Sequence, residues 1–147
     1  MVMNDKSGKE KIEAFTPRDW QPLFALIPEI EGTSTFGEWK GGGKDQEGVI
    51  QFPYCNSEPI VSRFLEVVYD LPVIIDFNWG AWDEGRKMTD DEGFDFDSVD
   101  LFTKCKLITA IVRSDRFCEG ALVSAFKSGL ILKILKSMER EVHGGRH

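Results

Sequence analysis

Residues 101–138 read LFTKCKLITAIVRSDRFCEGALVSAFKSGLILKILKSM, and this stretch decides the fold of the C-terminal third of the chain. Apolar side chains recur along it at the three- and four-residue spacing of one helix face, beginning at Leu101 and ending at Met138. Gly129 follows Lys127 and Ser128, a place where glycine often ends a helix in the left-handed conformation. The stretch therefore predicts three consecutive helices.

The sequence before this stretch predicts a small sheet and two short helices. Thr16 and the proline after it are typical of a helix start, and a second apolar helix face follows Ser57. Residues 33–39 and 48–54 are expected to be strands, and residues 73–79 alternate in the manner of a half-buried strand. Together these patterns predict an α+β fold with a small sheet of about three strands packed against several helices and an all-helical C-terminal third.

The length of 147 residues suits a single domain. We expect residues 1–15 to be a flexible arm, residues 16–141 to form one globular α+β domain, and residues 142–147 to be a frayed tail. No window is apolar over the 18 or more residues of a membrane helix, so no membrane partner is expected, and the polar N-terminus shows no secretory signal. Three widely spaced cysteines are typical of a reducing compartment, which predicts a cytoplasmic protein.

The formal charge of −7 is unevenly distributed along the chain. Residues 83–100 hold eight acidic and two basic side chains, whereas residues 101–147 hold four acidic and nine basic ones. Overall acidity disfavours direct nucleic-acid binding, which depends on a positive surface. Segments of opposite charge attract each other, and they also make an external partner charge-selective.

The sequence lacks the patterns of several common catalytic sites. The two histidines, His143 and His147, both lie in the tail, where an imidazole is poorly placed for nucleophilic catalysis. The cysteines form no C-x-x-C pair, and the glycines at 41–43 are not followed by the Lys-Ser or Lys-Thr of a phosphate loop. We therefore assign no catalytic residue, no metal site and no cofactor.

An acidic segment precedes the three C-terminal helices. Its carboxylates lack the spacing of an EF-hand loop, and Asp95 and Asp97 give only a weak Mg²⁺ pattern. The favoured interpretation is a solvated loop whose last residues cap the next helix. Its candidate functional role is an acidic interaction surface made of Asp90, Asp91, Glu92, Asp95 and Asp97.

Two arginines, Arg113 and Arg116, lie about one helical turn apart at the junction between two of the predicted helices. The favoured interpretation is structural: both pair with carboxylates of the same chain and hold the C-terminal helices against the acidic front half. The functional alternative is an anion site at which both guanidinium groups grip a phosphate or carboxylate. Tyr54, Trp79 and Trp82 would then supply an aromatic wall.

The stretch from Leu107 to Met138 also resembles the C-terminal signature of a small prokaryotic family catalogued only as a domain of unknown function. That signature is Arg, two residues, Arg-Phe, then two glycines before a last short helix, and the matching positions are Arg113, Arg116, Phe117, Gly120 and Gly129. A weaker likeness includes the Pro-Tyr at 53–54 and the two tryptophans Trp79 and Trp82. The resemblance implies a compact domain and brings no activity, cofactor or catalytic residue.

These observations favour a non-catalytic cytoplasmic domain that acts through protein–protein interaction. One alternative is an acidic nucleic-acid mimic that blocks the basic groove of a partner protein. Another is a Mg²⁺-dependent nucleotide or phosphoester enzyme in which the arginine pair holds the anion and Asp76, Asp95 or Asp97 holds the metal. The sequence also leaves a homo-oligomer open, because exposed aromatic side chains suit a dimer interface as well as a ligand wall.

Overall fold

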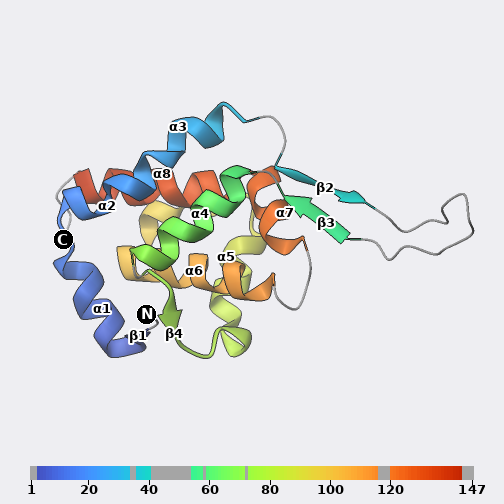
Figure 1. Ribbon diagram of the computed structural model, residues 1–147. Helices are drawn as coiled ribbons and strands as arrows, with labels where there is room; N and C mark the ends of the chain where they lie inside the picture. The colour runs from blue at the N-terminus through green and yellow to red at the C-terminus, as the bar shows by residue number, and fades with distance from the viewer. Residues whose placement is uncertain are drawn as a thin grey trace, which may run out of the picture.

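The computed structural model describes residues 3–33, 36–40, 54–57, 59–71, 73–115 and 120–143. Most of these residues belong to helices (Figure 1). The helices are α1 (Asp5–Ala14), α2 (Pro17–Phe24), α3 (Leu26–Glu31), α4 (Pro59–Asp70), α5 (Asp83–Asp90), α6 (Leu101–Ser114), α7 (Ala121–Lys127) and α8 (Leu130–His143), with 3-10 turns η1 (Trp79–Ala81) and η2 (Phe96–Ser98).

The fold is all-α, so the predicted α+β fold with a three-stranded sheet is wrong. Within the described residues, extended backbone is limited to two separate pairs. β1 (Met3–Asn4) runs parallel to β4 (Ile75–Asp76), and β2 (Gly37–Lys40) runs antiparallel to β3 (Tyr54–Ser57). No layer of three strands forms in this part of the chain, and the domain is held together by helix packing.

Residues 73–79 show why the strand prediction failed. Val73, Ile74 and Ile75 are exposed by at most 1%, so consecutive side chains are buried instead of alternate ones. A half-buried strand needs one solvated face, and this segment has none over those three residues. Only Ile75 and Asp76 pair as a strand, and by Trp79 the backbone has entered the turn η1. The segment passes through the core as a short connection.

The predicted flexible arm is instead mostly the helix α1. Ile12 is fully buried, and α1 packs against α6 and β4. Pairing of Met3 with Ile75 fixes the chain just before the helix. At the other terminus α8 continues to His143 with Val142 buried, and residues 144–147 of the predicted tail lie outside the described residues.

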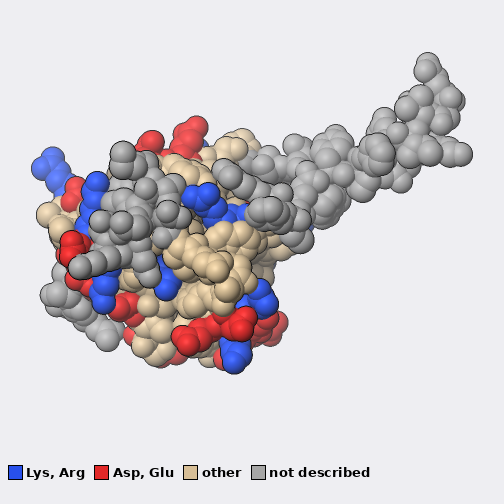
Figure 2. All heavy atoms as spheres, turned by 90° about the horizontal axis from the view of Figure 1, so that it is seen from below, with Lys and Arg blue, Asp and Glu red and all other residues tan. Residues whose placement is uncertain are grey.

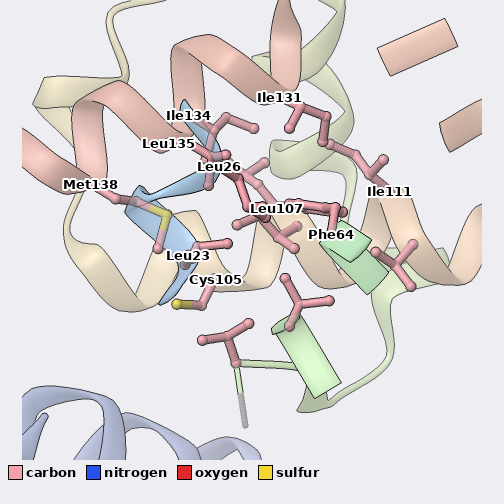
Figure 3. Packing of buried hydrophobic residues seen from close by; sticks show 14 of the residues in the cluster. Leu23, Leu26, Phe64, Cys105, Leu107, Ile111, Ile131, Ile134, Leu135 and Met138 are labelled. Carbon is pink, nitrogen blue, oxygen red and sulfur yellow. The ribbon is translucent and has the colours of Figure 1, made fainter. Parts of the chain in front are cut away.

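Helix α8 organises the core. It packs against α2, α3, α6, α7 and η2, and Figure 1 shows it running beside α2. Its apolar residues recur every three or four positions, so one stripe of the helix is buried. Figure 3 shows side chains from five helices pointing toward one another; those labelled are Leu23, Leu26, Phe64, Cys105, Leu107, Ile111, Ile131, Ile134, Leu135 and Met138.

Helix ends follow local sequence rules at three places. Thr16 and Asp19 form a capping box at the start of α2, in which each side chain accepts a hydrogen bond from the other residue's backbone N–H. Gly120 and Gly129 have φ of 90° and 84°, a left-handed conformation that strains residues with a side chain. Gly129 allows the sharp turn from α7 to α8, and Gly120 is the residue that directly precedes α7. No helix in the described ranges combines the length and apolarity needed to cross a bilayer.

Candidate functional site

A cleft of about 390 Å³ lies where the ends of α1, α2, α6 and α8 meet, at the left of Figure 1. Aromatic and aliphatic side chains form most of its wall, and carboxylates interrupt it. We name it the acidic cleft and define it by three carboxylates and three rings: Glu13, Asp100, Glu141, Phe15, Trp20 and Phe102.

Glu141, which lines the acidic cleft, forms a buried ion pair with Lys104, and we call this pair the floor of the cleft. Lys104 Nζ donates to Glu141 Oε1 at 2.6 Å; Lys104 is fully buried and Glu141 is 7% exposed. The other carboxylate oxygen of Glu141 accepts a hydrogen bond from the backbone N–H of Leu101 at 3.0 Å. Glu141 on α8 therefore neutralises a buried lysine and also satisfies a free N–H at the start of α6.

The rim of the cleft carries a carboxylate that is ionised at neutral pH. Asp100 caps α6 by accepting from the backbone N–H of Thr103 at 2.8 Å. Burial alone would raise the pKa of Asp100. Hydrogen bonds from the Thr103 side chain and backbone, with the positive charges of Lys9 and Lys104, outweigh that effect and lower its pKa below the ordinary value. Glu13, which is exposed on α1, adds a second carboxylate to the rim.

The aromatic wall of the cleft is held rigidly. Phe15 meets Trp20 edge to face with ring centroids 5.3 Å apart, and Trp20 stacks on Phe24 at 5.9 Å. Both distances are typical of favourable aromatic pairs. Trp20 is 1% exposed, so its indole forms the buried part of the wall, while Phe15 is half-buried and presents ring surface to the cleft.

Basic residues of α8 attach this helix to acidic parts of the chain. Arg140 donates to both carboxylate oxygens of Asp97, at 3.2 and 3.1 Å, and Ser137 Oγ donates to the same group at 2.5 Å. Lys136 pairs with Glu31 at 2.9 Å. These ion pairs form a charge clamp between α8 and acidic residues earlier in the chain; neither predicted arginine belongs to α8.

Of the predicted arginine pair, Arg113 is the member that the structure describes. Arg113 is half-buried on α6 and forms no ion pair with any described acidic side chain. It does not line the acidic cleft. Arg116 lies outside the described residues. The charge clamp therefore cannot be attributed to Arg113.

The other predicted site residues are spread over different parts of the molecule. Trp79 and Trp82 line a second hollow beside α5, whereas the side chain of Tyr54 lies outside the described residues. In the predicted acidic surface, Asp97 is half-buried, and the other four residues are exposed: Asp90, Asp91, Glu92 and Asp95. On the face that Figure 2 shows, basic and acidic side chains are interspersed, without a broad area of one sign.

Within the described ranges, no three His, Cys, Asp or Glu side chains gather in a way that could hold a metal ion. The side chain of Asp76, a predicted metal ligand, lies outside those ranges. Cys105 is fully buried, and burial strongly raises the pKa of its thiol, which therefore stays protonated at neutral pH. Cys105 fits the predicted role of a small buried apolar residue; the side chains of Cys55 and Cys118 are not described.

Sequence reasoning missed Lys104 and Glu141, although a signal for both is present. Lys104 lies three residues after Leu101 and four before Ile108, on the apolar stripe of α6. Glu141 lies three residues after Met138, on the apolar stripe of α8. A charge on each of two buried stripes indicates a buried ion pair, because an isolated charge at either place would be costly.

The interaction of Asp97 with Ser137 and Arg140 predicts a pH-dependent contribution to stability. Hydrogen bonds from Ser137 and then Arg140 lower the pKa of Asp97 below its ordinary value of 3.8. Because the folded-state pKa is the lower one, the stabilisation is complete above the unfolded-state pKa and is lost as the pH falls through the folded-state pKa. Asp97→Asn is expected to cost about 1 kcal/mol at pH 7, a difference that shrinks below about pH 4.

Urea unfolding of the wild type and Asp97→Asn between about pH 3 and 7 measures this difference. Asp90→Asn is the matched control, because Asp90 is exposed and takes no part in the Ser137–Arg140 cluster. Its effect at neutral pH should stay within about 0.5 kcal/mol. An Asp97→Asn effect that is the same at pH 3 and pH 7 would contradict the prediction.

Comparison with known proteins confirms the resemblance to a family without known activity. Residues 15–144 match the family described as "Family of unknown function (DUF6508)". No curated protein and no solved structure matches the chain. The match begins at Phe15 and includes α2 to α8, so all of α1 precedes it.

Proposed function

The chain belongs to this family of unknown function, and we propose that it is a non-catalytic domain of the cytoplasm that acts by binding another protein. The acidic cleft supports this proposal. Its volume of about 390 Å³ falls in the range of ligand sites in proteins, which is about 300–1,000 Å³. It combines apolar walls with a few charged groups, and this combination is typical of a binding pocket.

An arginine side chain of the partner is the occupant that best fits the cleft. A guanidinium group is planar and weakly hydrated, so it can lie on the ring surface that half-buried Phe15 presents to the cleft while it donates to carboxylates. The acceptors at the rim are Asp100, kept ionised by its lowered pKa, and Glu13. A lysine would make the same charge contact without the planar stacking surface. The aliphatic stem of the arginine would cover the apolar wall.

Glu141 has a different role in this proposal. Its two carboxylate oxygens already accept hydrogen bonds from Lys104 and from the backbone of Leu101. The positive charge of Lys104 therefore already neutralises Glu141, which attracts a cationic ligand only weakly. It holds the floor in place, and the attraction for a cation comes from the rim. Lys9 opposes that attraction, because its positive charge acts on Asp100. The balance of Asp100, Glu13 and Lys9 should therefore set the affinity.

The test is an NMR titration of ¹⁵N-labelled protein with the peptide Ac-Leu-Arg-Leu-NH₂. We expect saturable shifts at the Trp20 indole and at Leu101, with a dissociation constant on the order of 1 mM for so small a ligand. The peptide Ac-Leu-Gln-Leu-NH₂, which lacks the charge, should bind about tenfold more weakly. Asp100→Asn should weaken the binding of the arginine peptide by a similar factor, because asparagine still caps the helix but carries no charge.

Two further variants sharpen this test. Lys9→Gln should strengthen binding by a few-fold, since it removes the opposing charge near Asp100. Glu10→Gln removes one acid from the same helix outside the cleft and should change the affinity by less than about twofold. Equal affinity for the two peptides would refute the arginine site. Shifts at Trp20 that grow with protein concentration alone would assign the cleft to a second copy of this chain and also overturn the proposal.

A further inference from the structure

A second hollow, of about 220 Å³, lies between η1, α5 and the last turns of α6. It is separate from the acidic cleft, since it adjoins the C-terminal end of α6 and the cleft adjoins the N-terminal end. We name it the indole hollow and define it by the two indoles and the polar and aliphatic groups that face them: Trp79, Trp82, Arg86, Thr89, Ile111 and Ser114.

The indole of Trp82 is fixed in place on several sides. Phe77 meets it edge to face at 5.5 Å, and Lys106 Nζ lies 4.7 Å from its ring centre. On α5 the ring packs directly over Gly85, where a Cβ atom would collide with the ring carbons. This wall of the hollow is therefore preformed, and a ligand would contact it without ordering the side chain first.

The charge of the hollow is opposite to that of the acidic cleft. Arg86 lines the hollow, and no acidic residue does. Its side chain is 64% exposed and makes a hydrogen bond to the Gly80 carbonyl at 3.3 Å and a long ion pair with Asp83 at 3.9 Å. A guanidinium group has five N–H donors, so donors remain for an anion. In an acidic protein, this local positive site would select anions.

The hydroxyl groups of the hollow are set up as acceptors. Ser114 Oγ donates to the carbonyl of Ile111 at 2.9 Å, and Thr89 Oγ1 donates to the carbonyl of Arg86 at 3.0 Å. Each hydroxyl has one proton, which is already donated to a carbonyl. Both hydroxyl oxygens can therefore still accept a hydrogen bond from a ligand. A ligand with a ring N–H can therefore be held here as well as an anion.

From these features we propose that the indole hollow binds a small heteroaromatic carboxylate, a flat molecule of one or two rings that carries an N–H. The ring packs against the indoles of Trp79 and Trp82 that line the hollow, the carboxylate pairs with Arg86, and the N–H donates to Ser114 or Thr89. The volume of about 220 Å³ is below the usual range for drug-sized ligands, which limits the occupant to this size. The site is independent of the proposed arginine site.

Indole-3-carboxylate is the probe, titrated into ¹⁵N-labelled full-length protein at pH 7 and low ionic strength. We expect saturable shifts of the Trp79 and Trp82 indole signals, an unchanged Trp20 signal, and a dissociation constant of about 1 mM or tighter. Indole-3-carboxamide has the same shape without the charge and should bind about tenfold more weakly. 1-Methylindole-3-carboxylate, which lacks the N–H, should bind a few-fold more weakly.

Arg86→Gln should weaken the binding of indole-3-carboxylate about tenfold. The variant should fold like the wild type, because the side chain of Arg86 is exposed. Lys87→Gln is the matched control: it removes the neighbouring positive charge on α5, which does not line the hollow, and should leave the affinity within about twofold. Equal binding of carboxylate and carboxamide, or equal weakening by the two variants, would overturn the proposal. Absence of saturable shifts up to about 10 mM would overturn it as well.

Discussion

Glu141→Gln is expected to lower the free energy of unfolding by about 3 kcal/mol, although it changes only one charge. The substitution keeps the shape of the side chain and an oxygen that can accept from the Leu101 backbone. It removes the counter-charge of Lys104, which is fully buried and pairs with Glu141 at 2.6 Å. A buried ammonium group without a counter-charge is strongly unfavourable. Urea unfolding followed by circular dichroism measures the loss.

The double variant Lys104→Met/Glu141→Gln separates the charge effect from packing. With neither charge present, stability should return to within about 1 kcal/mol of the wild type, because an apolar side chain of similar length replaces the buried lysine. The double-mutant cycle should give a coupling energy of about 2 kcal/mol or more. Additive effects of the two substitutions would show that the ion pair has no energetic coupling, and the description of the floor of the cleft would then be wrong.

Gly85→Ala is expected to destabilise the protein by about 1–3 kcal/mol, although alanine is the better helix former. A Cβ atom at this position would overlap the ring carbons of Trp82. The indole would have to rotate away and lose its contacts with Phe77 and Lys106. Thermal unfolding measures the loss, and a red shift of tryptophan fluorescence should report that Trp82 has moved toward water.

Gly93→Ala is the control for this substitution. The atom nearest to a Cβ at Gly93 is Asp91 Oδ1 at 3.7 Å, an ordinary contact, so the change should stay within about 0.5 kcal/mol. A stabilised Gly85→Ala variant with unchanged fluorescence would mean that helix propensity outweighs the collision. In the variant Gly85→Ala/Trp82→Ala the collision is absent, so the alanine at 85 should no longer destabilise relative to Trp82→Ala alone.

The helices of the C-terminal third could be predicted because their buried stripes face one way. In α8, the spacing of Ile131, Ile134, Leu135 and Met138 corresponds to one helix face, and that face is buried. The same reasoning failed at Val73 to Ile75, where neither side is solvated and alternation carries no information. The predicted sheet depended on that segment, so the fold class was wrong, whereas the three C-terminal helices were predicted correctly.

The candidate sites depended on tertiary pairing, which periodicity does not encode. The sequence predicts that basic C-terminal residues attach to acidic ones, and Arg140 with Asp97 does so, but the choice of Arg113 could not be derived from spacing. Helix α5 was expected to be a loop because its one buried residue is Gly85, which gives no apolar stripe. In a helix, Arg86 follows Trp82 by one turn, and this relation places the guanidinium beside the indole.

We expect helix α1 to be attached more weakly than the other walls of the acidic cleft, and this bears on how a partner gains access. Of the side chains that the structure describes in α1, Ile12 is the one that is buried. Segments with few buried apolar contacts undock at a much lower free energy than the whole domain unfolds. We expect α1 to detach as a unit while α6 and α8 stay folded. Amide hydrogens of α1 would then exchange with solvent far sooner than those of α8, and a large partner would enter during such openings.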